Sequence, residues 1–281
     1  MISMACADGG ALWLSAGGTG RFFRWEMTAA ESEPTASAVP YASLSHPDEA
    51  AMEQLNARME ALEERFHIRL SVIPAQARTE GVAYDGMPDY LPAQSARALE
   101  LLEDALERLP EDFLRTVGRK AGGPLRVELA DRFDPAWPVS PGSGSIDLTD
   151  GKTVLRADMS ADLAAVFYHE LWHIMEVEIR NDSDDLNRWN RLNPDGFAYT
   201  GQVETDPERY AGATADGYGM VSAREDRAQL FAYACMAEQA DRFTQPVMQE
   251  KLRFLSELLR EHFDPEGEPV WEQYLEKESE E

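Results

Sequence analysis

Two histidines stand four residues apart around a glutamate in the segment His169-Glu-Leu-Trp-His173. Residues at positions i and i+4 of a helix lie one above the other, so both imidazoles can reach one metal ion at the roughly 2.0 to 2.1 Å that zinc requires. Glu170 lies beside this face, where its carboxylate can take a proton from a water that the metal activates. The segment predicts His169 and His173 as zinc ligands and Glu170 as a catalytic base.

A chance match is the alternative interpretation of this segment. The chain has five histidines, and the residues on both sides of the motif are apolar, as a buried metal site requires. Trp172 points away from the two histidines on a helix and is most simply a core residue. The spacing and its apolar surroundings together favour a metal site.

A catalytic zinc ion usually has three protein ligands and a water, so one more ligand must come from elsewhere in the chain. Glu225 is the strongest candidate, because it lies in the first turn of a predicted helix that Ser222 can cap. A carboxylate at this position is also an ordinary favourable charge at a helix N-terminus. A metal-bound histidine usually donates its other N–H to an acceptor, for which Asp226, Asp216 or Glu176 are candidates.

The motif together with the downstream segment Ser222-Ala-Arg-Glu-Asp226, which opens an Ala/Phe-rich helix, resembles the gluzincin metallopeptidases, particularly those related to the anthrax lethal factor catalytic domain. The resemblance implies His169, His173 and Glu225 as zinc ligands and Glu170 as general base. It also implies that Tyr218, seven residues before Glu225, stabilises the oxyanion. A phenol suits that role because it donates a hydrogen bond without carrying a charge. A tyrosine packed on the surface of a loop is the alternative.

One segment departs from the gluzincin pattern. Residues 213–219, Ala-Thr-Ala-Asp-Gly-Tyr-Gly, partly resemble the Gly-Thr-x-x-Asp-x-x-Tyr-Gly segment of aspzincins, in which the aspartate binds zinc. The spacing from aspartate to tyrosine is one residue short here. Asp216 is therefore an alternative third ligand, and Glu225 is preferred because a helix can hold it rigidly.

The elements that must position these residues follow from apolar periodicity and capping signals. Helices are predicted at 47–66, 95–109, 160–180, 223–243 and 247–262, with a further amphipathic segment at 269–278. Strands are predicted at 67–73 and 124–130, and residues 145–158 are expected to form a hairpin or bent edge strand that turns at Asp150-Gly151. The stretch 189–218 is expected to be rich in loops.

Composition limits the classes of function. The chain carries 52 acidic and 26 basic residues, a formal net charge of -26, which argues against binding to nucleic acids or anionic membranes. No run of about 18 apolar residues predicts a membrane span. Cys6 and Cys235 imply no disulfide framework, and Cys235 is expected to be a buried hydrophobic residue of a helix.

Residues 1–43 are expected to be a flexible segment, mostly linker with at most one strand, and Ala5 and Ala7 resemble the end of a secretory signal. An extracytoplasmic or secreted protein is therefore expected, with a cytoplasmic one as the alternative. Residues 44–281 are expected to form one α+β, zincin-like metallopeptidase domain. This domain would have a small mixed sheet with an edge strand over the cleft, an active-site helix and a mostly helical C-terminal half.

The expected function is zinc-dependent endopeptidase activity, in which a zinc-activated water attacks the peptide bond. The substrate would be a peptide or protein, and a monomer is favoured. The alternative is a catalytically silent zincin-like module that binds a protein or cell-wall partner.

Overall fold

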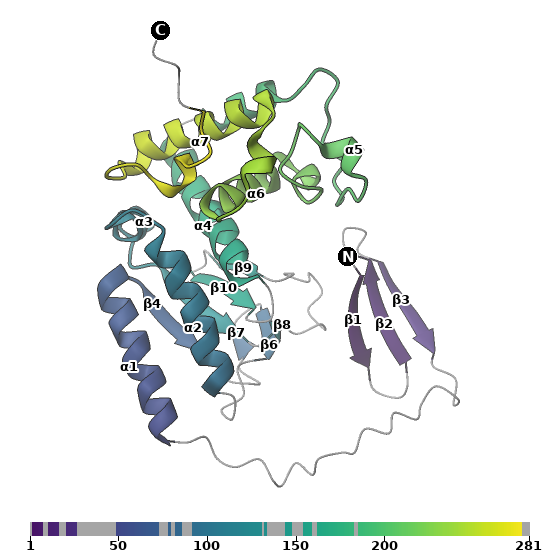
Figure 1. Cartoon of the computed structure of the whole chain (residues 1–281). Coiled ribbons are helices and arrows are strands. Elements are labelled where there is room, and N and C mark those ends of the chain that lie inside the picture. The colour runs from purple at the N-terminus through teal and green to yellow at the C-terminus, as the bar shows by residue number, and fades with distance from the viewer. Residues whose placement is uncertain are drawn as a thin grey trace.

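The structure is a computed structural model of the 281-residue chain. It describes residues 49–72, 92–130, 162–182 and 185–276, together with the strand segments 2–7, 11–16, 21–26, 78–79, 82–85, 132–133, 144–147 and 154–158. Within these residues, helices and a small mixed sheet share one hydrophobic core, which makes the fold α+β (Figure 1).

The central sheet has four strands in the order β4 (Arg69–Val72), β7 (Arg126–Ala130), β10 (Val154–Asp158) and β9 (Gly144–Asp147). β4, β7 and β10 are parallel, whereas β9 runs antiparallel to β10 and forms the edge. The prediction of strands at 67–73 and 124–130 is confirmed. The turn expected at Asp150-Gly151 lies outside the described residues, and β10 is an internal strand, so β9 alone forms the edge that was predicted for 145–158.

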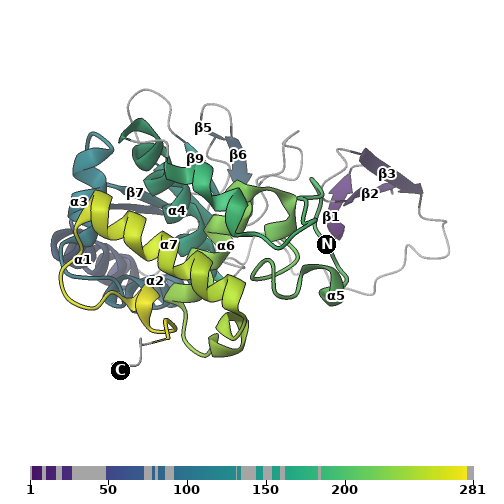
Figure 2. The same ribbon diagram turned by 90° about the horizontal axis from the view of Figure 1, so that it is seen from above.

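Three helices pack side by side against this sheet (Figures 1 and 2). They are α1 (Glu49–Phe66), α2 (Pro92–Glu107) and α4 (Leu163–Asp182). Their buried faces carry apolar residues at helical spacing, among them Leu55 and Leu62 on α1 and Leu99 and Leu102 on α2. The short helix α3 (Phe113–Lys120), which the sequence did not predict, follows α2 and buries Phe113 and Val117.

The chain after α4 is mostly helical, as expected. It contains α5 (Pro207–Tyr210), α6 (Ala223–Cys235), α7 (Pro246–Phe263) and the 3₁₀ turns η3 (Asp185–Leu192), η4 (Gly219–Val221), η5 (Ala240–Phe243) and η6 (Val270–Glu272). Cys235 is fully buried at the end of α6, as predicted, and is a free thiol.

The prediction of a continuous helix at 223–243 is wrong in its length. α6 ends at Cys235, where Met236 becomes extended, and Glu238 has a positive φ of 59°. The Tyr274 hydroxyl forms hydrogen bonds with backbone groups after the end of the helix. It donates to the Met236 carbonyl at 2.8 Å and accepts from the Gln239 N–H at 2.9 Å. This contact comes from a distant part of the chain. The segment 269–278 likewise contains only the 3₁₀ turn η6 within its described residues.

The N-terminal segment also differs from its prediction. Three strands, β1 (Ile2–Ala7), β2 (Ala11–Ala16) and β3 (Arg21–Glu26), pair antiparallel in sequence order, where at most one strand was predicted. A second small sheet pairs β5 (Arg78–Thr79), β6 (Val82–Asp85) and β8 (Arg132–Phe133). No helix in the described part of the chain is both long and apolar enough to span a membrane.

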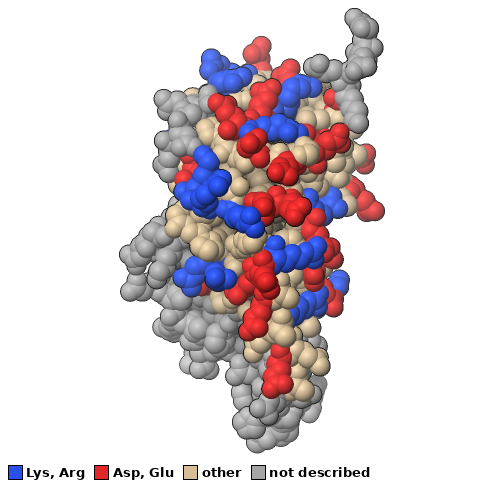
Figure 3. All heavy atoms as spheres, turned by 90° about the vertical axis from the view of Figure 1, so that its left-hand side faces the viewer, with Lys and Arg blue, Asp and Glu red and all other residues tan. Residues whose placement is uncertain are grey.

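Acidic and basic side chains interleave on the face of the molecule that Figure 3 shows. On α1 and α2 they form ion pairs, for example between Arg58 and Glu103 at 2.7 Å and between Arg65 and Glu107 at 2.7 Å. The acidic surplus therefore does not gather into one patch on this face.

Candidate metal centre

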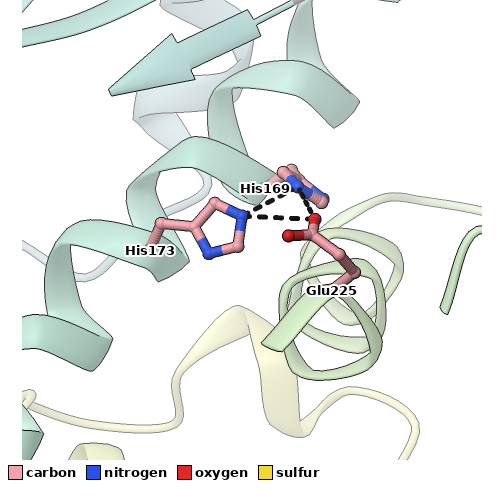
Figure 4. Close-up of side chains that lie close together, drawn as sticks. All are labelled: His169, His173 and Glu225. Carbon is pink, nitrogen blue, oxygen red and sulfur yellow. Dashed lines mark hydrogen bonds and ion pairs between the residues drawn. The ribbon is translucent and has the colours of Figure 1, made fainter. Parts of the chain in front are cut away.

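Two helices bring three potential metal ligands together (Figure 4). His169 and His173 lie on the same face of α4, and Glu225 faces them from the first turn of α6. The two Nε2 atoms are 3.0 Å apart, and the Glu225 Oε2 atom lies 3.1 Å from that of His169 and 3.4 Å from that of His173. The structure thus places Glu225, and not Asp216, beside the two histidines.

Apolar packing holds α4 against α6 at this point. Trp172 is fully buried, as predicted, and its ring centroid lies 5.6 Å from that of Phe231 on α6. Tyr168, one turn earlier on α4, packs edge-on against the same ring. The Ser222 hydroxyl accepts from the Glu225 N–H at 3.3 Å and caps α6, as the sequence predicted. Glu225 is therefore held at a capped helix end whose next turns are anchored in the core.

A glutamine on α6 determines the tautomer of His169. Gln229 Nε2 donates to the Asp216 carboxylate at 2.6 Å, so its Oε1 atom, 2.7 Å from His169 Nδ1, can only accept. His169 must then carry its proton on Nδ1, and its Nε2 lone pair points at His173 and Glu225. This is the arrangement that a metal ligand needs.

The hydrogen bonds of His173 differ from those of His169. Arg224 Nε donates to His173 Nδ1 at 3.1 Å, which leaves the proton of a neutral ring on Nε2. That single proton lies between the lone pairs of His169 Nε2 and Glu225 Oε2. A metal ion bound at the same point would take the place of this proton.

The spacing of the three atoms fits a tetrahedral zinc site. Ligands at 2.0 to 2.1 Å from a tetrahedral centre are roughly 3.3 Å from one another, and the three observed separations are 3.0, 3.1 and 3.4 Å. His169 and His173 are also buried, with 9% and 4% of their surface exposed, as ligands of a metal held in the protein interior would be. The residues present can therefore hold a metal ion.

Burial and charge shift the pKa values of the residues in this cluster. Burial raises the pKa of Glu170 to about 7, although His169 opposes the shift. Burial alone would raise the pKa of Glu225, but the adjacent imidazoles of His169 and His173 outweigh it and hold the pKa well below its usual range. The pKa of His173 is lowered, mainly by burial. Burial also lowers the pKa of His169, but its contact with Glu225 and the charge of the nearby carboxylates outweigh this and raise the pKa.

Asp216 connects Gln229 to the turn that carries Tyr218 through hydrogen bonds. One of its carboxylate oxygens accepts from Gln229 Nε2 and from the Tyr233 hydroxyl at 2.9 Å, and the other accepts from the backbone N–H groups of Tyr218 and Gly219. Both oxygens of Asp216 are thus occupied by donors within the protein. The carboxylate connects the Gln229–His169 pair to the turn that carries Tyr218.

Tyr218 lies beside His169 at the surface of the protein. Its side chain is 41% exposed, and its ring centroid is 5.8 Å from that of His169. Burial raises its pKa to about 12, so the phenol keeps its proton at neutral pH. The loop beneath it is fixed by backbone hydrogen bonds from Glu204 to Gly217 and from Thr200 to Met220. Residue 217 must be glycine, because a Cβ there would lie 1.7 Å from the Glu204 carbonyl oxygen.

The three acids predicted to accept a hydrogen bond from a ligand imidazole do not do so directly. Glu176 pairs with Arg227 and Arg180, and it also accepts from the Trp172 indole. Asp226 bonds Lys251, Tyr199 and Trp189 in the core. Gln229 and Arg224 contact the imidazoles instead, and sequence reasoning missed both. Gln229 stands one helical turn after Glu225, and this spacing could have indicated it.

Comparisons with known proteins point to one solved structure. No protein family model and no curated protein sequence matches this chain. The structure is similar to the crystal structure of a Bacteroides caccae protein described as a candidate zinc-binding metallo-peptidase. The likeness is one of fold. The TM-score is 0.51 at 16% sequence identity, over 78% of this chain and 88% of the other.

Proposed function

We propose that this protein is a zinc-dependent endopeptidase of the gluzincin type, with His169, His173 and Glu225 as metal ligands. The observation that carries the proposal is the convergence of three metal-binding atoms from two helices at the spacing of a tetrahedral zinc site. The zinc-binding metallo-peptidase description of the structural neighbour agrees with this assignment.

The residues around the metal would each carry out a different step of peptide hydrolysis. Zinc, when bound, supplies a Lewis acid that polarises a carbonyl group and lowers the pKa of water to about 7. Glu170, next to His169 and largely buried, accepts the proton of the attacking water and passes it to the leaving amine. Tyr218, which is protonated, exposed and beside His169, donates a hydrogen bond to the developing oxyanion.

The edge strand β9 offers a place for the substrate backbone. It is the last strand of the central sheet and lies beside α4, the helix that carries both histidines. An extended peptide that pairs with a free sheet edge gains main-chain hydrogen bonds. This pairing would align a substrate beside the metal centre without specifying its side chains.

The decisive experiment combines zinc analysis with a peptide-library assay of the wild-type protein and the Glu170→Gln variant. We expect one zinc ion per chain in both proteins and cleavage by the wild type alone, because Glu170 moves protons and does not bind the metal. Zinc at unit stoichiometry without cleavage of any peptide would instead support the alternative, a catalytically silent binding module. Protein that binds no zinc would contradict both.

The third ligand is tested by two alanine variants. Glu225→Ala removes one of the three converging atoms, and we expect it to lose stoichiometric zinc. Asp216→Ala leaves all three in place, and we expect it to retain zinc. Metal analysis after gel filtration measures both, and the reverse pattern would assign the ligand to Asp216.

A further inference from the structure

An exposed arginine contacts one of the proposed metal ligands and has no part in the reaction described above. Arg224 precedes Glu225 in the first turn of α6, and its side chain is exposed. Its guanidinium group contacts His173 through Nε, and its charge acts on Glu170, His173 and Tyr218. The cation therefore contacts one proposed ligand, and its charge acts on the proposed base and the proposed oxyanion donor.

Arg224 differs from the arginines that stabilise the neighbouring helices. Arg227, one turn further along α6, is buried and bonds Glu176 through two nitrogens, at 2.8 and 3.2 Å. Arg224 forms no ion pair with a carboxylate in the described part of the chain, and its two Nη groups bond nothing there. The donors that suit bidentate recognition of a carboxylate are thus available.

Metal binding would release Arg224 from its contact with His173. A histidine that binds a metal through Nε2 carries its proton on Nδ1. His173 Nδ1, which accepts from Arg224 Nε, would then become a donor, and two donors cannot share a hydrogen bond. The guanidinium would need a new acceptor, and it lies beside His173, one of the three proposed ligands.

We propose that Arg224 binds a carboxylate group of the substrate close to the scissile bond, and so directs the enzyme to peptides that are acidic at the cleavage site. The inference rests on the proposed peptidase function. The carboxylate is that of an aspartate or glutamate side chain, or of a peptide C-terminus, because both present the same two oxygens to the guanidinium. Arg224 acts in this role on substrate and not on the metal.

The test measures binding separately from cleavage. Zinc-loaded Glu170→Gln protein is titrated with fluorescent peptides that differ at one position as Glu, Gln or Lys, each with an amidated or a free C-terminus. We expect about tenfold tighter binding of the Glu peptide than of the Gln peptide, and a reversed preference, for Lys, in the Glu170→Gln/Arg224→Glu protein. If tighter binding follows the free C-terminus, the carboxylate recognised is the terminal one.

Two control variants distinguish a contact with substrate from a general charge effect and from support of His173. Arg119→Glu, an exposed charge reversal on α3, changes the net charge equally and should leave the Glu and Lys preferences unchanged. Arg224→Gln should bind zinc at least as tightly as the wild type, because the metal-bound state has already lost the bond to His173. A tenfold or greater loss of zinc affinity in Arg224→Gln would overturn the inference and make Arg224 a support for His173.

The outcomes also separate the inference from the proposed function. If peptides bind with the expected preference but the wild type cleaves none, hydrolysis is wrong and the role of Arg224 stands. If Arg224→Glu leaves the preference unchanged, or no peptide binds, the inference is wrong. Cleavage of the same peptides by the wild type would still support the peptidase.

Discussion

The hydrogen-bond chain from Asp216 through Gln229 to His169 orients a proposed metal ligand. Gln229 accepts from His169 Nδ1 and is itself held by Asp216, so the imidazole has one tautomer and one ring orientation. The Gln229 amide accepts the imidazole N–H, a role that a carboxylate often has beside a metal-bound histidine. The negative charge of Asp216 is separated from His169 by the Gln229 side chain.

Gln229→Leu is expected to weaken zinc binding about 10- to 100-fold, because His169 loses the acceptor that orients it. Competition with a fluorescent zinc chelator measures the change. Gln202→Leu, an exposed glutamine whose side chain makes no such contact, is the matched control. Equal zinc affinity in the two variants would show that Gln229 does not orient the ligand.

The motif residues could be predicted from the sequence because helical spacing alone places two histidines on one face. Glu225 could be predicted because a serine cap fixes the start of its helix. The contact of Arg224 with His173 could not be predicted, because it depends on the orientation of α6 relative to α4. The packing of Trp172 against Phe231 sets that orientation. Spacing along one helix does not report the orientation of another.

At the scale of elements, a buried ion pair joins α4 to α6 beside the candidate metal centre. The side chains of Glu176 and Arg227 are 2% and 4% exposed, and Trp172 and Arg180 also donate to the carboxylate. Burial raises the pKa of Glu176, but the bonds from Arg227 outweigh it and hold the pKa below its usual range. The two helices that carry the candidate ligands are thus joined by charge as well as by apolar contacts.

Glu176→Gln is expected to destabilise the fold by about 3 to 5 kcal/mol, because it leaves the Arg227 charge buried without a partner. The folded pKa of Glu176 lies below the unfolded value of about 4.3, so its contribution is present above that pH and is lost as the pH falls through the folded pKa. Urea unfolding between pH 7 and pH 3 should therefore show the wild type and the variant converging at low pH. Glu100→Gln, in an exposed pair with Arg97, should cost less than about 1 kcal/mol.

The order of helices and strands around the sheet could be predicted from apolar periodicity, since α1, α2, α4 and α7 each carry a long buried face. The end of α6 could not, because no proline or glycine marks it and Tyr274, far along the chain, ends the helix. α3 was missed because eight residues are too few for a periodic signal to stand out.

At the scale of the whole molecule, a bound metal would link two parts of the fold. His169 and His173 belong to the helix packed on the sheet, and Glu225 begins the C-terminal helical half. A ligand that binds the folded state and not the unfolded chain stabilises it in proportion to the logarithm of its concentration over its Kd. Zinc binding should therefore be visible in the stability of the entire domain.

Chelation of zinc is expected to lower the melting temperature by roughly 5 to 10 °C relative to protein with zinc at about 100 times its Kd. Differential scanning calorimetry with and without a chelator measures the shift. Glu225→Ala should melt at the same temperature under both conditions. A wild-type melting temperature that does not respond to the chelator would contradict a metal site in the folded protein.

Three consecutive side chains in the first turn of α6 lie in three different environments. Arg224 is exposed, Glu225 faces the histidines, and Asp226 is fully buried against Lys251. The inward residue anchors the turn, so the outward residue is free to vary without moving the one between them. If Arg224 selects the substrate, a single substitution at this surface position would change which peptides are cleaved. The three proposed metal ligands would keep their positions, so substrate preference could evolve independently of the metal centre.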